Sequence, residues 1–137
     1  MIEAKVIQKI RELLIADTTV KAQVKDRVYS SHISSVSSPV YPAISITMLP
    51  GQARTNVPAM VNMLIQIDLW FPFDQYTIDD VMDCYDAIRT LLHRQNLTDN
   101  TIGIQVNQII ESGVGPVIPD PDANCYHFPA RYAVVAI

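Results

Sequence analysis

The spacing of apolar and polar positions changes near the middle of the chain. From Met60 to Phe71 every second residue is apolar, namely Val61, Met63, Ile65, Ile67, Leu69 and Phe71. After a turn at Pro72–Asp74 the spacing becomes three and four residues, with apolar side chains at Ile78, Val81, Met82, Tyr85, Ile88 and Leu92. Strands repeat every two residues and helices every 3.6. The pattern therefore predicts a half-buried strand that leads directly into an amphipathic helix packed on it.

Helical spacing also marks the start of the chain. Residues 2–15 place apolar side chains on one helical face and charged ones on the other, which predicts an N-terminal amphipathic helix. Asp17 or Thr18 is placed to cap a short second helical turn. A brief extended piece is expected at Arg27–Tyr29. The serine-rich segment Ser30–Pro39 is predicted to be a loop, either a plain flexible connector or a segment that orders on meeting a partner.

A hairpin is predicted ahead of the long strand. Ala43–Leu49 alternates as a strand does, and Gln52–Ala59 then forms a long extended tip that returns the chain to the long strand. Long extended loops often carry binding. Arg54 and Asn56 in this tip are therefore candidate partner-binding residues, expected to contact a neighbouring subunit or another assembly protein.

The C-terminal part is predicted to form a second pair of strands. Alternation over residues 102–106 breaks at Asn107–Gln108, where we expect a bulge. Gly113–Asn124 is rich in Gly, Pro and Asp and is predicted to be a loop. The last strand carries its apolar face over residues 128–136. Pro129 lacks an N–H, which places that end of the strand at a sheet edge or just entering the sheet.

These elements predict a single α+β domain over residues 1–137. We expect a mostly antiparallel four-stranded sheet, with the N-terminal helix and one long helix packed on one face, and long hairpin loops. The opposite face mixes Met60, Leu64 and Trp70 with Asn62, Gln66 and Asp68. Such a mixed face meets either solvent or a neighbouring subunit. Leu64 is therefore a candidate partner-binding residue.

Composition favours contacts with other proteins. Charged residues make up 18% of the chain, against about 25% in an average soluble domain. Apolar residues make up 49%, and this surplus hints at a subunit interface. The net charge of −4 argues against a nucleic-acid grip, which needs clustered Lys and Arg. No stretch of 18 apolar residues occurs, so we expect no membrane span.

Aromatic and basic residues near the long helix each admit two interpretations. Trp70 and Tyr76 flank the turn before the helix and act either as interface anchors or as core aromatics. Arg89, His93 and Arg94 gather at the end of the helix. There they complement the helix dipole, and a phosphate site is the alternative.

The ionisable residues point to no reaction. Thr77 and Asp80 resemble a capping box, and Asp79 lies in the first helical turn, where negative charge is stabilising. Asp83 and Asp86 are predicted to face solvent. A metal or acid–base role for these carboxylates would need a histidine or a second acidic cluster opposite them, and the sequence places neither there. A zinc site would have Cys84, Cys125 and His127, one ligand short of the four that a closed site needs.

No nucleophile elbow, phosphate-binding glycine loop, His-Glu-x-x-His or dinucleotide motif occurs. We therefore expect a protein that is not an enzyme and that holds no cofactor and no metal. The alternative hypothesis is an enzyme whose site is not recognised from the sequence. A deep pocket with two or more convergent ionisable side chains would favour it.

Short sequence runs along nearly the whole chain carry a resemblance to a known family. These runs are Val24-x-x-Arg27–Val28–Tyr29, Tyr41–Pro42–Ala43–Ile44–Ser45–Ile46, Gln66–Ile67–Asp68–Leu69–Trp70, Ile88-x-x-Leu91–Leu92, and Asp122, Tyr126 and His127 opening a strand that runs to Ala133–Val134–Val135. The chain resembles the tail completion, or tail terminator, family of long-tailed bacteriophages and prophages.

The resemblance implies a structural virion protein without catalytic residues. It implies a homo-hexameric ring that caps the tail tube, ends its polymerisation and joins it to the head connector. The implied partners are further copies of the chain, the tail tube protein and the head-completion or connector protein; genomic DNA would pass through the channel without specific binding. The implied location is the tail or neck of the virion, and the host cytoplasm during assembly. A head-closure or other neck adaptor protein, or a small non-catalytic binding protein outside the virion, is the alternative.

Overall fold

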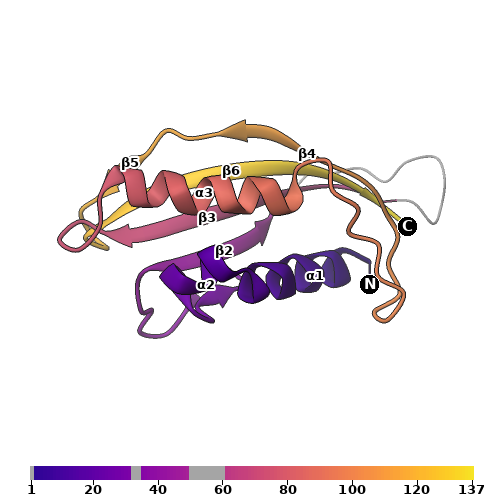
Figure 1. The fold of residues 1–137 in the computed structure, drawn as a ribbon, viewed down its shortest axis with the longest axis horizontal. Helices are drawn as coiled ribbons and strands as arrows, with labels where there is room; N and C mark the ends of the chain where they lie inside the picture. The colour runs from indigo at the N-terminus through magenta and orange to yellow at the C-terminus, as the bar shows by residue number, and fades with distance from the viewer. Residues whose placement is uncertain (1, 32–34, 50–60) are drawn as a thin grey trace.

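The computed structural model describes residues 2–31, 35–49 and 61–137, and here helices lie along one face of a sheet (Figure 1). The helices are α1 (Ile2–Ala16), α2 (Thr18–Val24) and α3 (Ile78–Leu92). The strands are β1 (Val28–Tyr29), β2 (Ala43–Met48), β3 (Val61–Pro72), β4 (Val106–Val114), β5 (Ile118–Asp120) and β6 (Cys125–Ala136).

The sheet has six strands in the order β1-β2-β3-β6-β4, and β5 pairs with β6 beyond the end of β4. The predicted α+β class is confirmed, but the predicted four-stranded antiparallel sheet is wrong in two respects. Two short strands are added, and the sheet is mixed because β1 pairs with β2 in parallel. β1 has two residues and β5 three, which is too short for alternation to reveal. β5 and the end of β4 lie inside the predicted loop Gly113–Asn124.

Both predicted helix starts are confirmed. Asp17 is the N-cap of α2, and its carboxylate accepts a hydrogen bond from the Val20 N–H at 3.0 Å. Thr77 caps α3 in a full capping box: the Thr77 N–H donates to Asp80 Oδ2 at 2.8 Å, and the Asp80 N–H donates to the Thr77 hydroxyl. These caps satisfy N–H groups that the first helical turn leaves without a partner.

The main core lies between the helices and one face of the sheet, called here the helix face. The alternating residues of β3 are all buried there and pack with side chains from the helices, namely Val6, Ile10, Leu14, Val20, Val24, Val81, Cys84, Ile88 and Leu92. Tyr132 of β6 is the largest fully buried side chain. No helix in the described ranges is long and apolar enough to cross a membrane.

Strand β4 begins later than the alternation predicts. Ile104 forms only an isolated bridge with Asp99, and regular pairing with β6 starts at Val106. The predicted bulge is present, because the register of β4 shifts between Val106 and Gln108. A second shift follows between Glu111 and Gly113.

Pro129 does not lie at a sheet edge or at the start of a strand. It lies within β6, which pairs with β3 on one side and with β4 and β5 on the other. Its carbonyl accepts a hydrogen bond from the Gly115 N–H at 2.8 Å, so its backbone faces the gap between Val114 and Ile118, where β4 ends and β5 has yet to begin. The missing N–H therefore breaks no ladder hydrogen bond.

Candidate assembly surface

The sheet face opposite the helices is called here the outer face. It is the face on which the sequence predicts a mixture of apolar and polar side chains. Paired residues share a face, so the register sets Leu64 of β3 beside Ala133 of β6, and Ala133 beside Ile110 of β4. These three side chains form an apolar row across three strands, and Leu64 and Ile110 are half-buried. Arg131, exposed, lies two residues from Ala133 and is paired with Gln66.

One end of the outer face is covered by the chain itself. Trp70 is 6% exposed and forms a small second core with Ala43 and Cys125, against which Val36 and Tyr41 pack. Part of the serine-rich segment therefore lies over this end of the sheet. The contacts of Trp70 match the core-aromatic interpretation, and a contact of Trp70 with another protein stays a prediction.

Ring stacking and hydrogen bonds connect Trp70 to the centre of the outer face. Its indole stacks on the ring of His127, with centroids 4.0 Å apart and planes 3° from parallel, and its Nε1 donates to Ser45 Oγ at 3.2 Å. His127 Nε2 lies 2.6 Å from Asp68 Oδ1. These contacts hold the two rings in one fixed arrangement.

Asp68 continues the network toward the exposed part of the face. Its side chain is 6% exposed, and the same Oδ1 accepts a hydrogen bond from Gln66 Nε2 at 2.8 Å. Gln66 Oε1 in turn accepts from Arg131 Nε at 3.0 Å. A buried carboxylate is costly unless it is paired, and here His127 and Gln66 supply the partners. The alternation in β3 predicts that Asp68 lies on the outer face, but the sequence does not predict its hydrogen-bond partners.

A hollow of about 490 Å³ lies beside this network. It is called here the outer hollow and is lined by Leu64, Ser112, Gly113, Val114, Gly115, Pro129 and Arg131. Val114 on its border is 48% exposed, and Ile118, which starts β5, is 45% exposed. The hollow thus combines apolar walls with one cationic side chain.

The predicted partner-binding residues that the structure describes do not all lie on one face of the sheet. Tyr76 packs against the main core, with its ring edge-to-face on Phe71 at 5.2 Å, so it lies on the helix face. Leu64 and Trp70 lie on the outer face. Arg54 and Asn56 lie outside the described residues.

The basic residues at the end of α3 have separate roles. Arg89 Nε lies 3.3 Å from Glu111 Oε2, and His93 Nδ1 accepts a hydrogen bond from the Glu111 N–H at 3.0 Å. The Arg94 N–H donates to the Ile109 carbonyl at 2.8 Å. The end of α3 is thereby fixed to the outer edge of β4, and the three side chains do not converge on one anion.

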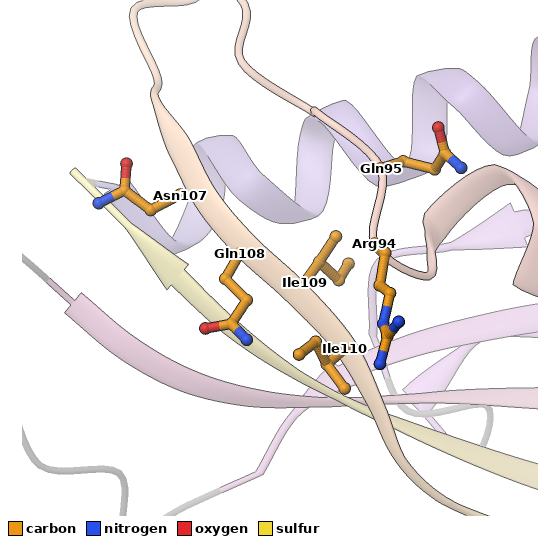
Figure 2. Close-up of a pocket in the computed structure, with 6 residues that line it drawn as sticks. All are labelled: Arg94, Gln95, Asn107, Gln108, Ile109 and Ile110. Atoms are coloured by element: carbon orange, nitrogen blue, oxygen red, sulfur yellow. The ribbon is translucent and has the colours of Figure 1, made fainter.

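Arg94 lines a second hollow, of about 480 Å³, along the edge of β4 (Figure 2). The other lining residues are Gln95, Asn107, Gln108, Ile109 and Ile110. Figure 2 shows the Arg94 side chain extending alongside β4 toward Ile110, while Gln95 points the other way. The lining offers amides, one cation and aliphatic carbon. It offers no nucleophile and no general base.

A third hollow, called here the acidic groove, lies between α2 and α3 and measures about 520 Å³. It is lined by Asp17, Thr19, Asp83, Asp86, Ala87, Thr90 and Leu91. Asp83 and Asp86 are exposed, as predicted, and neither carboxylate forms an ion pair within the described ranges. Among the described residues no group of three or more His, Cys, Asp or Glu is placed to hold a metal ion.

The cysteines are unsuited to chemistry. Burial raises the pKa of the Cys84 thiol to about 12, and burial followed by the charges of Asp120 and Asp74 raises the pKa of Cys125 to about 11. A thiol that stays protonated is a poor nucleophile and a poor ligand. Cys84 lies on the helix face and Cys125 on the outer face, so the sheet separates two of the three candidate zinc ligands.

Tyr85 and Tyr132 also stay protonated. The Tyr85 hydroxyl donates to Glu111, and burial followed by this hydrogen bond raises the pKa of Tyr85. Burial is likewise the main cause of the raised pKa of Tyr132. Together with the Arg89–Glu111 pair, the Tyr85 contact ties α3 to β4. The ionisable groups between helix and sheet thus serve packing.

No family model matches the chain, and neither does any curated protein. A solved structure described as "Virion of native gene transfer agent (GTA) particle" contains a chain that is similar over nearly the full length of both. The alignment covers 96% of this chain and 93% of that chain, with a TM-score of 0.70 and 12% identity. The two chains share one fold.

Proposed function

We propose that this chain is a structural subunit of a phage-like virion. The observation that carries the proposal is the full-length fold likeness to a chain of a gene transfer agent virion. The short sequence runs that resemble the tail completion family were found from the residues alone, and they support the same class of protein.

Within that class, the proposed role is a ring of six subunits that caps the tail tube, ends its polymerisation and joins it to the head connector. Rings need two different contact patches on each subunit, and rotation about an axis then closes the assembly. The outer face with its apolar row and the acidic groove between α2 and α3 supply two such unlike patches.

The proposed ring lets DNA pass without holding it. Six copies at −4 each carry −24, and such a field repels phosphates. Measured at about 0.15 M salt, the free protein should show no appreciable affinity for duplex DNA. Tight, salt-sensitive binding would contradict the conduit role.

We propose further that the protein has no catalytic activity. Support comes from the hollows described above: the ionisable side chains that line the acidic groove are all carboxylates, and the outer hollow and the hollow along the edge of β4 are each lined by a single ionisable side chain, an arginine. Support also comes from Asp68 and His127, which are engaged with each other beneath Trp70.

The decisive experiment adds the purified protein to tail tube protein during polymerisation. Electron microscopy should show shorter tubes with extra density at one end, and native mass spectrometry of those ends should count six copies. Unchanged tube lengths and bare ends would contradict tail termination. Binding to the connector but not to tube ends would instead assign a head-closure or neck role.

A further inference from the structure

The two edge strands of the described sheet, β4 and β1, are poorly suited to strand addition. On the outer edge of β4, the Ile109 carbonyl accepts from the Arg94 N–H, and the Glu111 N–H donates to His93. β4 also carries two register shifts, and the opposite edge strand, β1, is only two residues long. Short, bulged or covered edges discourage edge-to-edge pairing. Contacts between copies are therefore left to the faces of the subunit.

The exposed part of the outer face is apolar with one positive charge. Its apolar row, Leu64, Ala133 and Ile110, borders Arg131. Gln66 occupies only Nε of the Arg131 guanidinium. No described carboxylate forms an ion pair with Arg131, so its terminal nitrogens remain available to a partner.

The acidic groove has the opposite character. Asp83, Asp86 and Asp17 line it together with the apolar side chains of Ala87 and Leu91, and no basic side chain lines it. Asp83, Asp86 and Ala87 recur at helical spacing on one exposed side of α3. The groove thus offers negative charge beside apolar carbon, where the outer face offers positive charge beside apolar carbon.

From this complementarity we infer that the outer face of one copy seats on the acidic groove of the next copy, with Arg131 paired to Asp83 and Asp86. The contact uses two different patches and is therefore head-to-tail, which is the kind of contact that builds a ring. The inference rests on the ring assembly given as the proposed function. Within a single subunit the core and the sheet lie between the two patches. An Arg131 contact with Asp83 or Asp86 can therefore form only between copies.

Cross-linking tests the contact even if it is weak. In the Arg131→Lys variant, a zero-length reagent that joins amines to carboxylates should link position 131 to Asp83 or Asp86 of another copy. Peptide mass spectrometry of the concentrated protein reads out the link, and mixing isotope-labelled with unlabelled protein shows that it joins two chains. The inference would be overturned if the intermolecular products lack this link, or if no intermolecular product forms at the highest soluble concentration.

A charge exchange then tests head-to-tail geometry. R131E makes both patches negative, and D83K/D86K makes both positive. Each variant alone should lose at least tenfold in association, measured by sedimentation or by incorporation at tube ends. A one-to-one mixture should recover association with alternating subunits, because every contact then joins opposite charges.

Lys25→Glu is the matched control, since it makes the same charge change at an exposed position at the end of α2 that lines neither patch; its association should stay within twofold of the wild type. Monomer unfolding curves establish that each variant folds. Variants that associate normally, or a mixture that recovers nothing, would overturn the inference.

These outcomes are separable from those of the proposed function. Cross-links at the predicted positions together with bare tube ends would keep the contact and reject tail termination. Capped tubes whose subunits link elsewhere would keep the function and reject this contact.

Discussion

The two faces of the sheet bury their side chains in different ways. On the helix face, β3 and β6 contribute an unbroken apolar surface against which the helices pack. On the outer face, only the end around Trp70 is covered, and the rest combines the apolar row with the Asp68 network. The difference indicates that burial on the helix face supplies most of the folding free energy, whereas the uncovered part of the outer face is the surface proposed above for contact with another copy.

The largest expected effect tests this division directly. Ile67→Ala, at the centre of the helix face, should lower the free energy of unfolding by about 2–5 kcal/mol, because it removes buried methyl groups and leaves a cavity. Leu64→Ala, three positions away on the outer face, should cost under about 1 kcal/mol and instead weaken association. Denaturant unfolding and sedimentation measure the two quantities. Equal stability losses would break the distinction between the faces.

The outer face has a stability element of its own in Asp68. Asp68→Ala should cost about 1–3 kcal/mol, because it leaves His127 and Gln66 without their partner in a place with little water. Asp68→Asn keeps an acceptor oxygen and should cost less. Urea titration of both variants compares them, and a neutral Asp68→Ala would show that the network does not stabilise the fold.

The helix face should also be sensitive to alkali through Cys84. Its folded pKa of about 12 exceeds the ordinary value of 9.0, so the unfolded chain loses this proton first and stability falls as pH rises from 9 toward 12. The loss is about 1.4 kcal/mol per pH unit within that window. In Cys84→Ala, the free energy of unfolding should fall with pH less steeply than in the wild type, by this amount. Denaturant unfolding of both proteins at pH 8 to 10.5 measures the two slopes. Identical slopes would contradict the burial of this thiol.

The smallest effect concerns the start of α3, at the periphery of both faces. Thr77→Ala removes the capping hydroxyl and should cost about 1 kcal/mol, while Thr77→Ser should cost almost nothing. Thermal unfolding by circular dichroism compares the two. Association should be unchanged in both variants, because the cap touches neither contact patch.

Local patterns account for what could be predicted from the sequence. Alternation identifies β3, helical spacing identifies α1 and α3, and Asp17 and Thr77 act on N–H groups within three residues of themselves. Pairing between distant strands leaves no such local trace. Asp68 and His127 are 59 positions apart, and only the β3–β6 register brings them together.

Pro129 shows the same limit from the backbone side. Its ring argues for an edge, and the argument is physically sound, since a central strand needs its N–H groups. The structure places it centrally because the neighbouring strand is interrupted at that point, between β4 and β5. The interruption depends on how three strands align, which no single segment specifies.

The central place of β6 has a consequence for synthesis of the chain on the ribosome. Of the described strands β6 is the last to be made, and among them β3 and β4 are joined only through it. In a nascent chain that has not yet released residues up to Ala136, β3 lacks a neighbour along one side and β4 has no paired strand. Pairings across such sequence separations form slowly. We therefore expect the sheet to be completed only after β6 has been translated, and products truncated before β6 to be incompletely folded.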